Sequence, residues 1–329
     1  MTTLVTGATG FVGSAVARAL QARGHALRLL ARANSDRRNL EGLDAEVVTG
    51  DLTDPASLDR AAAGCRFVVH VAADYRIWVP DPNEMLRANV DGAVAMVRAA
   101  AAAGAERIVH CSSVAALGQI GDGTPADEET PTNEADFVGI YKRSKYLAER
   151  AVLDLARRDN LPLVVVNPSA PVGPRDIKPT PTGKMIRDAA AGRIPAFIDT
   201  GINIVHVDDV AEGHVLALER GRIGERYVLG GENMLLKDVL GLVASVAERR
   251  PPRIRLPEGV VWPAAFLMEH FARLTHIPPL MTRDHLKMAR KKMFYSSGKA
   301  KAELGYSPRP VRQAVEDAVA WFRAHGMLG

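Results

Sequence analysis

A glycine-rich turn near the start of the chain constrains the fold more than any other feature of the sequence. Residues 6–13 read Thr-Gly-Ala-Thr-Gly-Phe-Val-Gly, after a strand-like segment and before an amphipathic helix. Gly7 permits a tight turn, Gly10 lets the backbone approach a pyrophosphate, and Gly13 lets the helix pack closely on the strand. The helix N-terminus then faces the phosphate charge. We expect a dinucleotide site here rather than a merely structural turn, with contacts from Gly7, Thr9, Gly10, Phe11 and Val12.

The first half of the chain alternates short β-branched segments with alanine-rich helical stretches. The strand-like segments are residues 3–6, 26–30, 46–48, 67–71, 107–111 and 163–166. Strands that alternate with helices of this length imply βαβ crossovers and a parallel sheet. The sequence therefore predicts an α/β fold with a doubly wound parallel sheet of the Rossmann type.

The pattern changes after Pro168, where a segment rich in proline and glycine begins. Such an irregular stretch is typical of a region that carries specificity. Residues 204–207 resemble a strand, and Asp208 and Asp209 are good N-cap residues for the helix that follows, so both elements are expected to return to the sheet. The expected division is a dinucleotide-binding domain of residues 1–168, with 204–229 returning to it, and a smaller, mostly helical substrate-binding lobe of residues 169–203 and 230–329.

Composition and charge narrow the classes of function. Of 329 residues, 47% are hydrophobic and 24% are charged, as in an ordinary globular protein. Basic residues are spread along the chain, and their densest cluster, residues 290–292, lacks alternating aromatic residues, so we expect no nucleic-acid partner. Cys65 and Cys111 have no second cysteine or histidine pair nearby, which indicates neither a disulfide framework nor a metal site. With no secretory signal and no apolar run near the ~20 residues that span a bilayer, we expect a cytoplasmic protein.

The end of the second strand indicates which cofactor the turn binds. Arg32 stands at the end of Leu-Leu-Ala-Arg, where an NAD-selective protein often places an acid. A carboxylate there binds the ribose hydroxyls and repels a 2′-phosphate, whereas a guanidinium can pair bidentately with phosphate. NADP(H) is therefore the expected cofactor, and NAD(H) stays open as the alternative. Arg37 and Arg38 either assist Arg32 or are solvent-exposed charges.

Three polar residues form the expected catalytic group. Tyr141 and Lys145 are four residues apart and share one face if the segment is helical. A free tyrosine has a pKa of ~10, but a nearby ammonium and the positive nicotinamide of an oxidised cofactor favour phenolate, so we expect the pKa of Tyr141 to be lowered. A hydroxyl must also hold the substrate oxygen, and the strand at 107–111 leads into two serines. We choose Ser113 for this role, with Ser112 as the alternative.

Taken together, the motifs resemble those of the extended short-chain dehydrogenase/reductases over nearly the whole chain. Besides the glycine spacing and the Tyr-Lys pair, the resemblance rests on residues 167–174, 205–210 and 297–306. The branch is the one that contains dihydroflavonol 4-reductase and the nucleotide-sugar epimerases, and the match is closest to the bacterial hopanoid-associated sugar epimerases. The resemblance implies an NADP-dependent oxidoreductase or epimerase that transfers hydride at a carbonyl or carbinol carbon, with a tyrosine as general acid/base.

The resemblance also implies further cofactor contacts. Asp51 and Leu52, just past the third strand, resemble the family's adenine-contacting dipeptide. Ala72 and Ala73 resemble the small residues of the strand end beside the nicotinamide ribose. Pro168 and the Tyr-Lys pair complete the implied set.

Three further positions are compared with the family pattern. By the resemblance, Asn89 is the helical asparagine near the active site, and the alternative is a plain residue of a helix surface. Sugar epimerases usually carry the acid of an NAD binder where this chain has Arg32. The tyrosine common in the serine region of sugar-active relatives is replaced by Leu117. These two departures speak against a sugar epimerase.

Residues 74–78 follow the nicotinamide-side strand and form the expected substrate lip. Tyr75 and Trp78 offer flat apolar surface there, unless they are solvent-facing loop residues. His206 either lies close to the cleft or satisfies the sheet end, and Arg283 either binds an anionic substrate group or pairs with a neighbouring acid. The expected substrate, held also by Ser113, is a small-molecule carbonyl compound, polyol or sugar.

Three functions stay open on the sequence alone. A reductase delivers hydride from NADPH and releases NADP, whereas an epimerase returns hydride to the opposite face and retains its cofactor. A non-catalytic NADP-sensing protein would not need the Tyr-Lys pair, which this chain keeps. Family association, the apolar segment 260–268 and the basic residues 290–292 suggest a hopanoid-derived lipid as partner and a place at the periphery of the inner membrane. The resemblance also leaves a homodimer open.

Overall fold

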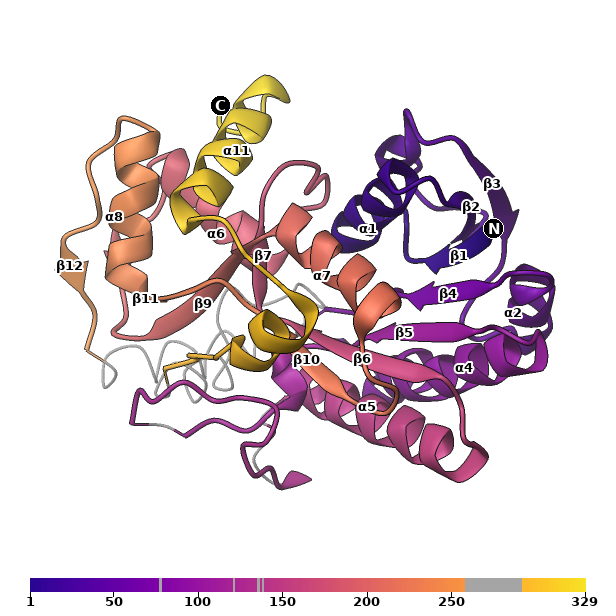
Figure 1. The fold of residues 1–329 in the computed structure, drawn as a ribbon. Coiled ribbons are helices and arrows are strands. Elements are labelled where there is room, and N and C mark those ends of the chain that lie inside the picture. The colour runs from indigo at the N-terminus through magenta and orange to yellow at the C-terminus, as the bar shows by residue number, and fades with distance from the viewer. Residues whose placement is uncertain (77–78, 121, 135–136, 138, 258–291) are drawn as a thin grey trace.

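A parallel sheet of seven strands forms the centre of the protein, as a computed structural model of the chain shows (Figure 1). The structure describes residues 1–76, 79–120, 122–134, 137, 139–257 and 292–329. The strands lie in the order β10-β6-β5-β4-β1-β2-β3, with every neighbouring pair parallel. Their bounds are β1 Thr2–Thr6, β2 Ala26–Ala31, β3 Ala45–Thr49, β4 Phe67–His70, β5 Arg107–Cys111, β6 Leu163–Pro168 and β10 Arg226–Leu229. The six strands predicted from the first half of the sequence are confirmed, and so is the doubly wound α/β fold.

Helices cover both faces of this sheet (Figure 1). One face carries α1 (Phe11–Ala22) and α7 (Val207–Arg220), and the other carries α2 (Pro55–Ala62), α4 (Gly92–Ala102) and α5 (Ile140–Asp159). Successive strand residues point to opposite faces, so Val68 packs with α4 and α5 while Val69 packs with α1 and α7. Because both faces are covered, the inner strands are rich in buried valine, isoleucine and leucine, whereas the edge strand β3 is largely exposed. Each buried valine contributes about 1.5–3 kcal/mol.

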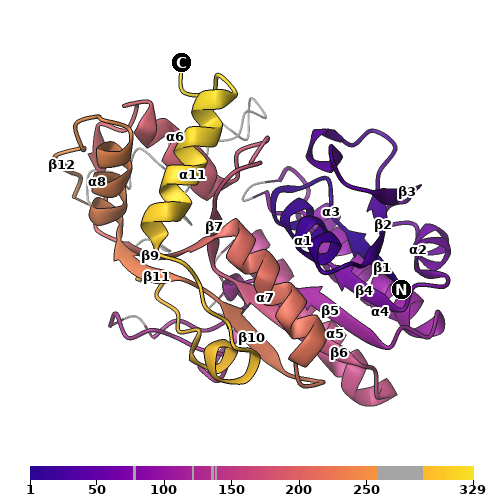
Figure 2. The same cartoon turned by 45° about the horizontal axis from the view of Figure 1, so that its top comes forward.

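A second group of elements packs beside the carboxyl end of the large sheet. It contains a three-stranded sheet of β7 (Ala170–Val172), β9 (Gly201–His206) and β11 (Glu232–Leu235), and a short pair of β8 (Ala196–Phe197) and β12 (Ile254–Arg255). The helices α6 (Pro181–Ala190), α8 (Leu236–Val246) and α11 (Val311–Ala324) share one core with this sheet. Figure 2 shows α11, next to the C-terminus, beside α6 and α8 and far from β1.

Two expectations for the segment after residue 200 are wrong. The strand expected at 204–207 does not return to the large sheet, because β9 pairs with β7 and β11, and β10 takes the edge position next to β6. The helix α7 does return and packs against α1. Its N-cap is His206, whose Nδ1 accepts from the Asp208 N–H at 3.0 Å. The two aspartates lie in the first helical turn instead, where Asp208 pairs with Arg175 and Asp209 with Arg309.

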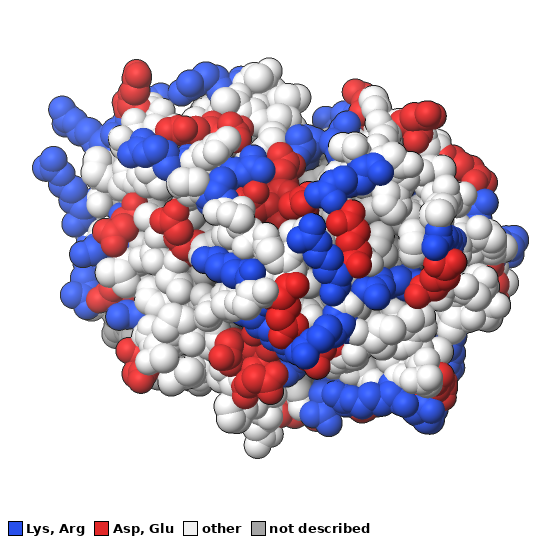
Figure 3. All heavy atoms as spheres, in the orientation of Figure 1, with Lys and Arg blue, Asp and Glu red and all other residues white. Residues whose placement is uncertain are grey.

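Short elements complete the described chain. They are the helix α3 (Pro82–Leu86), the 3₁₀ turns Arg38–Leu40 and Val114–Ala116, and the π turns Arg87–Asp91 and Ala300–Leu304. Within the ranges that the structure describes, no helix combines the length and the apolar character needed to cross a membrane. On the face drawn in Figure 3, basic and acidic side chains are mixed with one another.

Candidate active site

A large cleft opens at the carboxyl ends of the parallel strands, between the two groups of elements. Its volume of about 1810 Å³ exceeds the roughly 300–1,000 Å³ of a pocket for a drug-sized ligand, so it has room for a dinucleotide and a substrate together. Ligands of open α/β sheets bind at this edge. The predicted residues that line the cleft are Gly7, Thr9, Gly10, Phe11, Val12, Arg32, Asp51, Leu52, Ala72, Ala73, Tyr75, Ser113, Tyr141, Lys145 and Pro168. Trp78 and Arg283 lie outside the described residues.

The glycine turn brings backbone rather than side chains to the cleft. Gly7 has φ +75°, and a Cβ there would lie 2.7 Å from the backbone nitrogen of Ala72. A Cβ on Gly13 would lie 2.1 Å from the Gly7 carbonyl oxygen. Gly10 caps α1, and no side chain among the described residues caps the first helical N–H groups. The free N–H groups and the positive end of the helix dipole fit a pyrophosphate.

Positive charge lies where the adenosine half of a dinucleotide would extend from this turn. Arg32 follows β2 and lines the cleft together with Ser35. Burial alone would raise the pKa of Asp51, but its hydrogen bonds with Thr53 and the charge of Arg32 lower it. The two other candidate arginines, Arg37 and Arg38, do not line the cleft, and the second pairs with Asp36 at 2.6 Å.

The predicted catalytic residues meet on one wall of the cleft. Tyr141 and Lys145 lie in the first turns of α5, and Ser113 caps the 3₁₀ turn that follows β5. The Ser113 hydroxyl is hydrogen-bonded with the Tyr141 phenol and also accepts from the Ala115 N–H at 3.1 Å. Lys145 is buried and donates from Nζ to the Cys111 carbonyl oxygen at 3.0 Å. Ser113, and not Ser112, therefore shares a hydrogen bond with the phenol.

The protonation of this wall differs from the expectation. Burial raises the pKa of Tyr141 to about 12, and the Ser113 hydrogen bond offsets only part of this effect. Burial also lowers the pKa of Lys145, and the electrostatic effects of Cys111 and Glu149, which raise this pKa, offset only part of the change. In the chain without a cofactor the pKa of Tyr141 is therefore raised and not lowered, because desolvation of the phenol dominates. The lowering expected beside an oxidised nicotinamide stays a prediction. The phenol is thus protonated near neutral pH.

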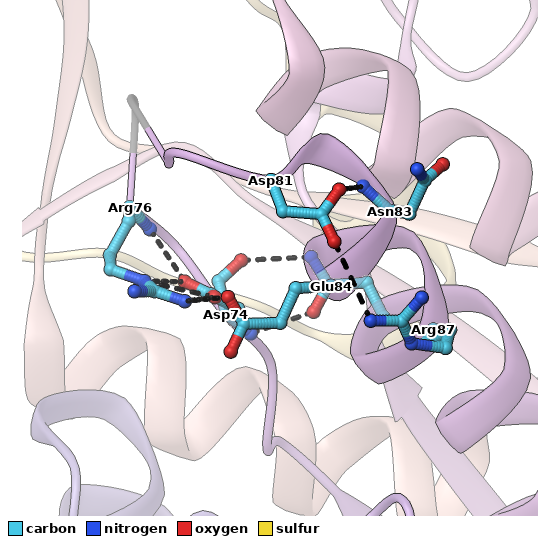
Figure 4. A network of polar contacts seen from close by, with 7 residues as sticks. Asp74, Arg76, Asp81, Asn83, Glu84 and Arg87 are labelled. Atoms are coloured by element: carbon cyan, nitrogen blue, oxygen red, sulfur yellow. Dashed lines mark hydrogen bonds and ion pairs between the residues drawn. The ribbon is translucent and has the colours of Figure 1, made fainter. Parts of the chain in front are cut away.

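Asn89 lies inside the protein and holds the loop that forms the cleft lip. It sits in the π turn Arg87–Asp91 and is 3% exposed, so the helix-surface alternative is wrong. Its Oδ1 accepts from the Asp74 N–H at 2.7 Å, and its Nδ2 donates to the Asp74 carbonyl oxygen at 2.8 Å and to Ser144 Oγ at 2.9 Å. Figure 4 shows the outer part of this lip, where Arg76 folds back onto Asp74 through paired hydrogen bonds of 2.5–3.0 Å. The backbone on the N-terminal side of Tyr75 is therefore anchored.

Two buried groups near the site escaped the sequence analysis. Asp176 lines the cleft and is 1% exposed, and burial raises its pKa to about 6. Its carboxylate accepts from the N–H and the hydroxyl of Thr180, the N-cap of α6, and the Thr-Pro pair at this helix start was a readable signal. Glu149, one helical turn after Lys145 on α5, gave no local signal. His206 does not line the cleft, and its Nε2 lies 3.1 Å from Asp317.

Three buried histidines make the fold sensitive to acid. His70 and His110 face one another on neighbouring strands with ring centroids 5.2 Å apart, and His214 lies on α7. Burial lowers the pKa of His70 to about 3 and of His214 to about 4, and the pKa of His110 lies well below its usual value. Among the described residues neither ring nitrogen of His110 has a hydrogen-bond partner.

We expect His110→Phe to weaken the dependence of stability on pH. Below pH 6.5 the unfolded chain protonates a histidine that the folded protein keeps neutral, so the stability present above pH 6.5 is lost as the pH falls. Between pH 7 and pH 5, the free energy of unfolding should fall by about 2 kcal/mol less in this variant than in the unchanged protein. Urea unfolding at both pH values measures this difference. Replacement of the exposed His325 by Gln is the control. If His110→Phe loses as much free energy of unfolding between pH 7 and pH 5 as the unchanged protein does, the prediction is contradicted.

Comparison with known proteins places the chain among related enzymes. The family described as "NAD dependent epimerase/dehydratase family" matches residues 3–230. The "Putative dihydroflavonol 4-reductase" of Synechocystis sp. is 40% identical over 328 residues, which cover 98% of this chain and 95% of that protein. The crystal structure of gox2253 has a TM-score of 0.91 and 59% identity, covering 100% of this chain and 99% of that one. The structure of PA4631, a nucleoside-diphosphate-sugar epimerase from Pseudomonas aeruginosa, has a TM-score of 0.82 and 27% identity with the same coverage.

Proposed function

Because the chain belongs to the NAD dependent epimerase/dehydratase family of extended short-chain dehydrogenase/reductases, and so is an NAD(P)-dependent enzyme, we propose that it is an NADP-dependent carbonyl reductase. The observation that carries the proposal is the hydrogen bond between Ser113 and Tyr141, next to buried Lys145 and in the cleft that the glycine turn lines. A pair of hydroxyls is what a carbonyl oxygen needs in order to be held and protonated. The similarity to a protein named as a dihydroflavonol reductase supports the same direction of chemistry.

In this mechanism the chain orients the substrate and supplies a proton. Ser113 Oγ and the Tyr141 phenol donate hydrogen bonds to the carbonyl oxygen, which polarises the carbonyl carbon. When bound, NADPH supplies the hydride for that carbon. Tyr141 gives its proton to the oxygen as negative charge develops there, and its raised pKa keeps the phenol protonated before the step. The charge of Lys145, held on the Cys111 carbonyl, then favours the phenolate that is left.

Arg32 should select NADPH over NADH. We expect Arg32→Ala to raise the Kd for NADPH about 10- to 100-fold, the effect of losing one charge-assisted phosphate contact, and to change the Kd for NADH less than about 3-fold. Quenching of protein fluorescence by each cofactor measures both constants. Arg157→Ala, at an exposed ion pair near the end of α5, controls for loss of positive charge alone. Equal affinities of the unchanged protein for NADPH and NADH would refute this role of Arg32.

An epimerase that retains its cofactor is the second candidate, favoured by the likeness to the Pseudomonas aeruginosa structure. An epimerase must first remove a proton from an alcohol, which requires the Tyr141 phenolate, whereas a reductase starts from the protonated phenol. Mass spectrometry of gently purified protein separates the candidates, since only the epimerase has to keep a stoichiometric cofactor through turnover. A non-catalytic NADP-sensing protein is disfavoured by the retained Tyr-Lys pair.

The finer expectations from the sequence complete the proposal. Homologues act on small molecules, and we propose a carbonyl compound, polyol or sugar whose apolar part rests on Tyr75. The division into residues 1–168 with 204–229, and 169–203 with 230–329, is proposed as the functional one. A hopanoid-derived lipid, a place at the membrane periphery and a homodimer are also proposed. The segment 260–268 behind the lipid proposal lies outside the described residues, so vesicle flotation tests it, and sedimentation equilibrium tests the dimer.

A further inference from the structure

A line of polar contacts runs behind the cleft from the edge strand β10 to the catalytic wall. Arg226 Nη1 lies 3.1 Å from Glu149 Oε1. Asn167 Nδ2 donates to Glu149 Oε2 at 2.6 Å and to the Ser113 carbonyl oxygen at 3.0 Å. The line thus connects β10, α5, β6 and the turn after β5, and it ends on the backbone of the residue that pairs with the Tyr141 phenol.

Glu149 and Asn167 are shielded from solvent, so water cannot take the place of either partner if their hydrogen bond is lost. The Glu149 side chain is 3% exposed, Asn167 is fully buried, and the Arg226 side chain is 28% exposed. A buried carboxylate is costly unless it is paired and hydrogen-bonded, and here it has both kinds of partner. The arginine is itself fixed, because it also donates to the Glu128 carbonyl oxygen. Neither Glu149 nor Arg226 lines the cleft.

The same carboxylate lies one helical turn beyond Lys145. Residues four apart on a helix share a face, so the negative charge of Glu149 acts on the ammonium from behind. Cys111 on β5 also raises the pKa of Lys145. The charge of Lys145 in turn lowers the pKa of the buried histidines His70 and His110. Burial lowers the pKa of Lys145, and the charge of Glu149 opposes that change.

We propose that Glu149 is a positioning residue of the active site, which fixes Ser113 through Asn167 and holds the charge of Lys145 from outside the cleft. It touches neither substrate nor cofactor. This inference rests on the proposed reductase function, in which both Ser113 and Lys145 take part.

The test is Glu149→Gln, which keeps an oxygen for Asn167 but removes the charge. We expect kcat to fall about 10-fold, with KM and the Kd for NADPH within about 3-fold, and the alkaline limb of the kcat profile to move to lower pH by about one unit. The limb moves to lower pH because loss of the negative charge lowers the pKa of Lys145, so the ammonium is deprotonated at lower pH. Asn167→Ala should lower kcat without moving that limb, because it leaves the charge in place.

Controls separate positioning from folding. The single variant leaves the charge of Arg226 without its carboxylate partner, so the double variant E149Q/R226Q, which removes both charges, is measured beside it. The melting temperature and the NADPH affinity of each variant show whether it is folded. Glu212 lies on α7 and forms an exposed ion pair with Arg23 at the end of α1. Glu212→Gln is the matched surface change and should leave the pH profile of kcat unchanged. An unmoved alkaline limb in folded Glu149→Gln would overturn the role of Glu149. The folded double variant shows whether the loss of kcat persists when no arginine is left unpaired. If the unchanged protein reduces no carbonyl compound with NADPH, the proposed function fails instead.

Discussion

Tyr141→Phe is expected to lower kcat for carbonyl reduction about 10²- to 10⁴-fold, the usual contribution of a positioned general acid. The phenyl ring keeps the packing of the phenol, and among the described residues the only hydrogen bond that acts on the Tyr141 hydroxyl is the one with Ser113. Loss of the hydroxyl removes the proton donor and one of two hydrogen bonds to the substrate oxygen. Stopped-flow absorbance of NADPH at a saturating ketone concentration measures the rate of the chemical step.

The control for this change lies on the same helix. Tyr146 stacks on Phe137 with ring centroids 4.4 Å apart and does not line the cleft, so Tyr146→Phe should keep kcat within about 2-fold. NADPH affinity should be unchanged in Tyr146→Phe, because this residue lies outside the cleft. Robust activity of Tyr141→Phe on a genuine substrate would remove Tyr141 from the mechanism.

Gly13→Ala should have the largest effect on cofactor binding. The added Cβ would lie 2.1 Å from the carbonyl oxygen and 2.5 Å from the carbonyl carbon of Gly7, and these are backbone atoms that cannot rotate away. Helix α1 must therefore move off the turn. We expect a loss of about 3 kcal/mol in the free energy of unfolding and at least about a 100-fold rise in the Kd for NADPH. Denaturant unfolding and cofactor titration measure the two effects.

A second helical glycine provides the matched change. Gly241 lies within α8, and a Cβ there would meet no atom within 4 Å. Gly241→Ala should therefore stabilise the protein by about 0.5–1 kcal/mol, the difference in helix propensity, and leave NADPH affinity unchanged. Similar behaviour of the two variants would show that the short distance at Gly13 is not what makes glycine necessary there.

The parts of the site that sequence predicts are those set by local geometry. The turn around Gly7 and Gly10 and the spacing of Tyr141 and Lys145 depend on residues close together in the chain, so their pattern is readable. The pKa of Tyr141 depends on desolvation by the whole fold, so the rise in this pKa in the chain without cofactor was not readable from the sequence. The role proposed for Glu149 depends on contacts with residues far along the chain, Asn167 on β6 and Arg226, 77 residues later. The placement of β9 beside β7 was likewise not readable, because it depends on pairing across the irregular segment.

The route of the chain through the two sheets makes them mutually dependent. Strands β1 to β6 are followed by the small sheet's β7 and β9, and only afterwards do α7 and β10 complete the large sheet. A polypeptide ending at residue 168 would leave the edge of β6 open and the apolar surface of α1 uncovered, both of which invite aggregation. The nucleotide-binding half is therefore not a detachable module. Any recombination that swaps the second half must carry residues 207–229 with the first.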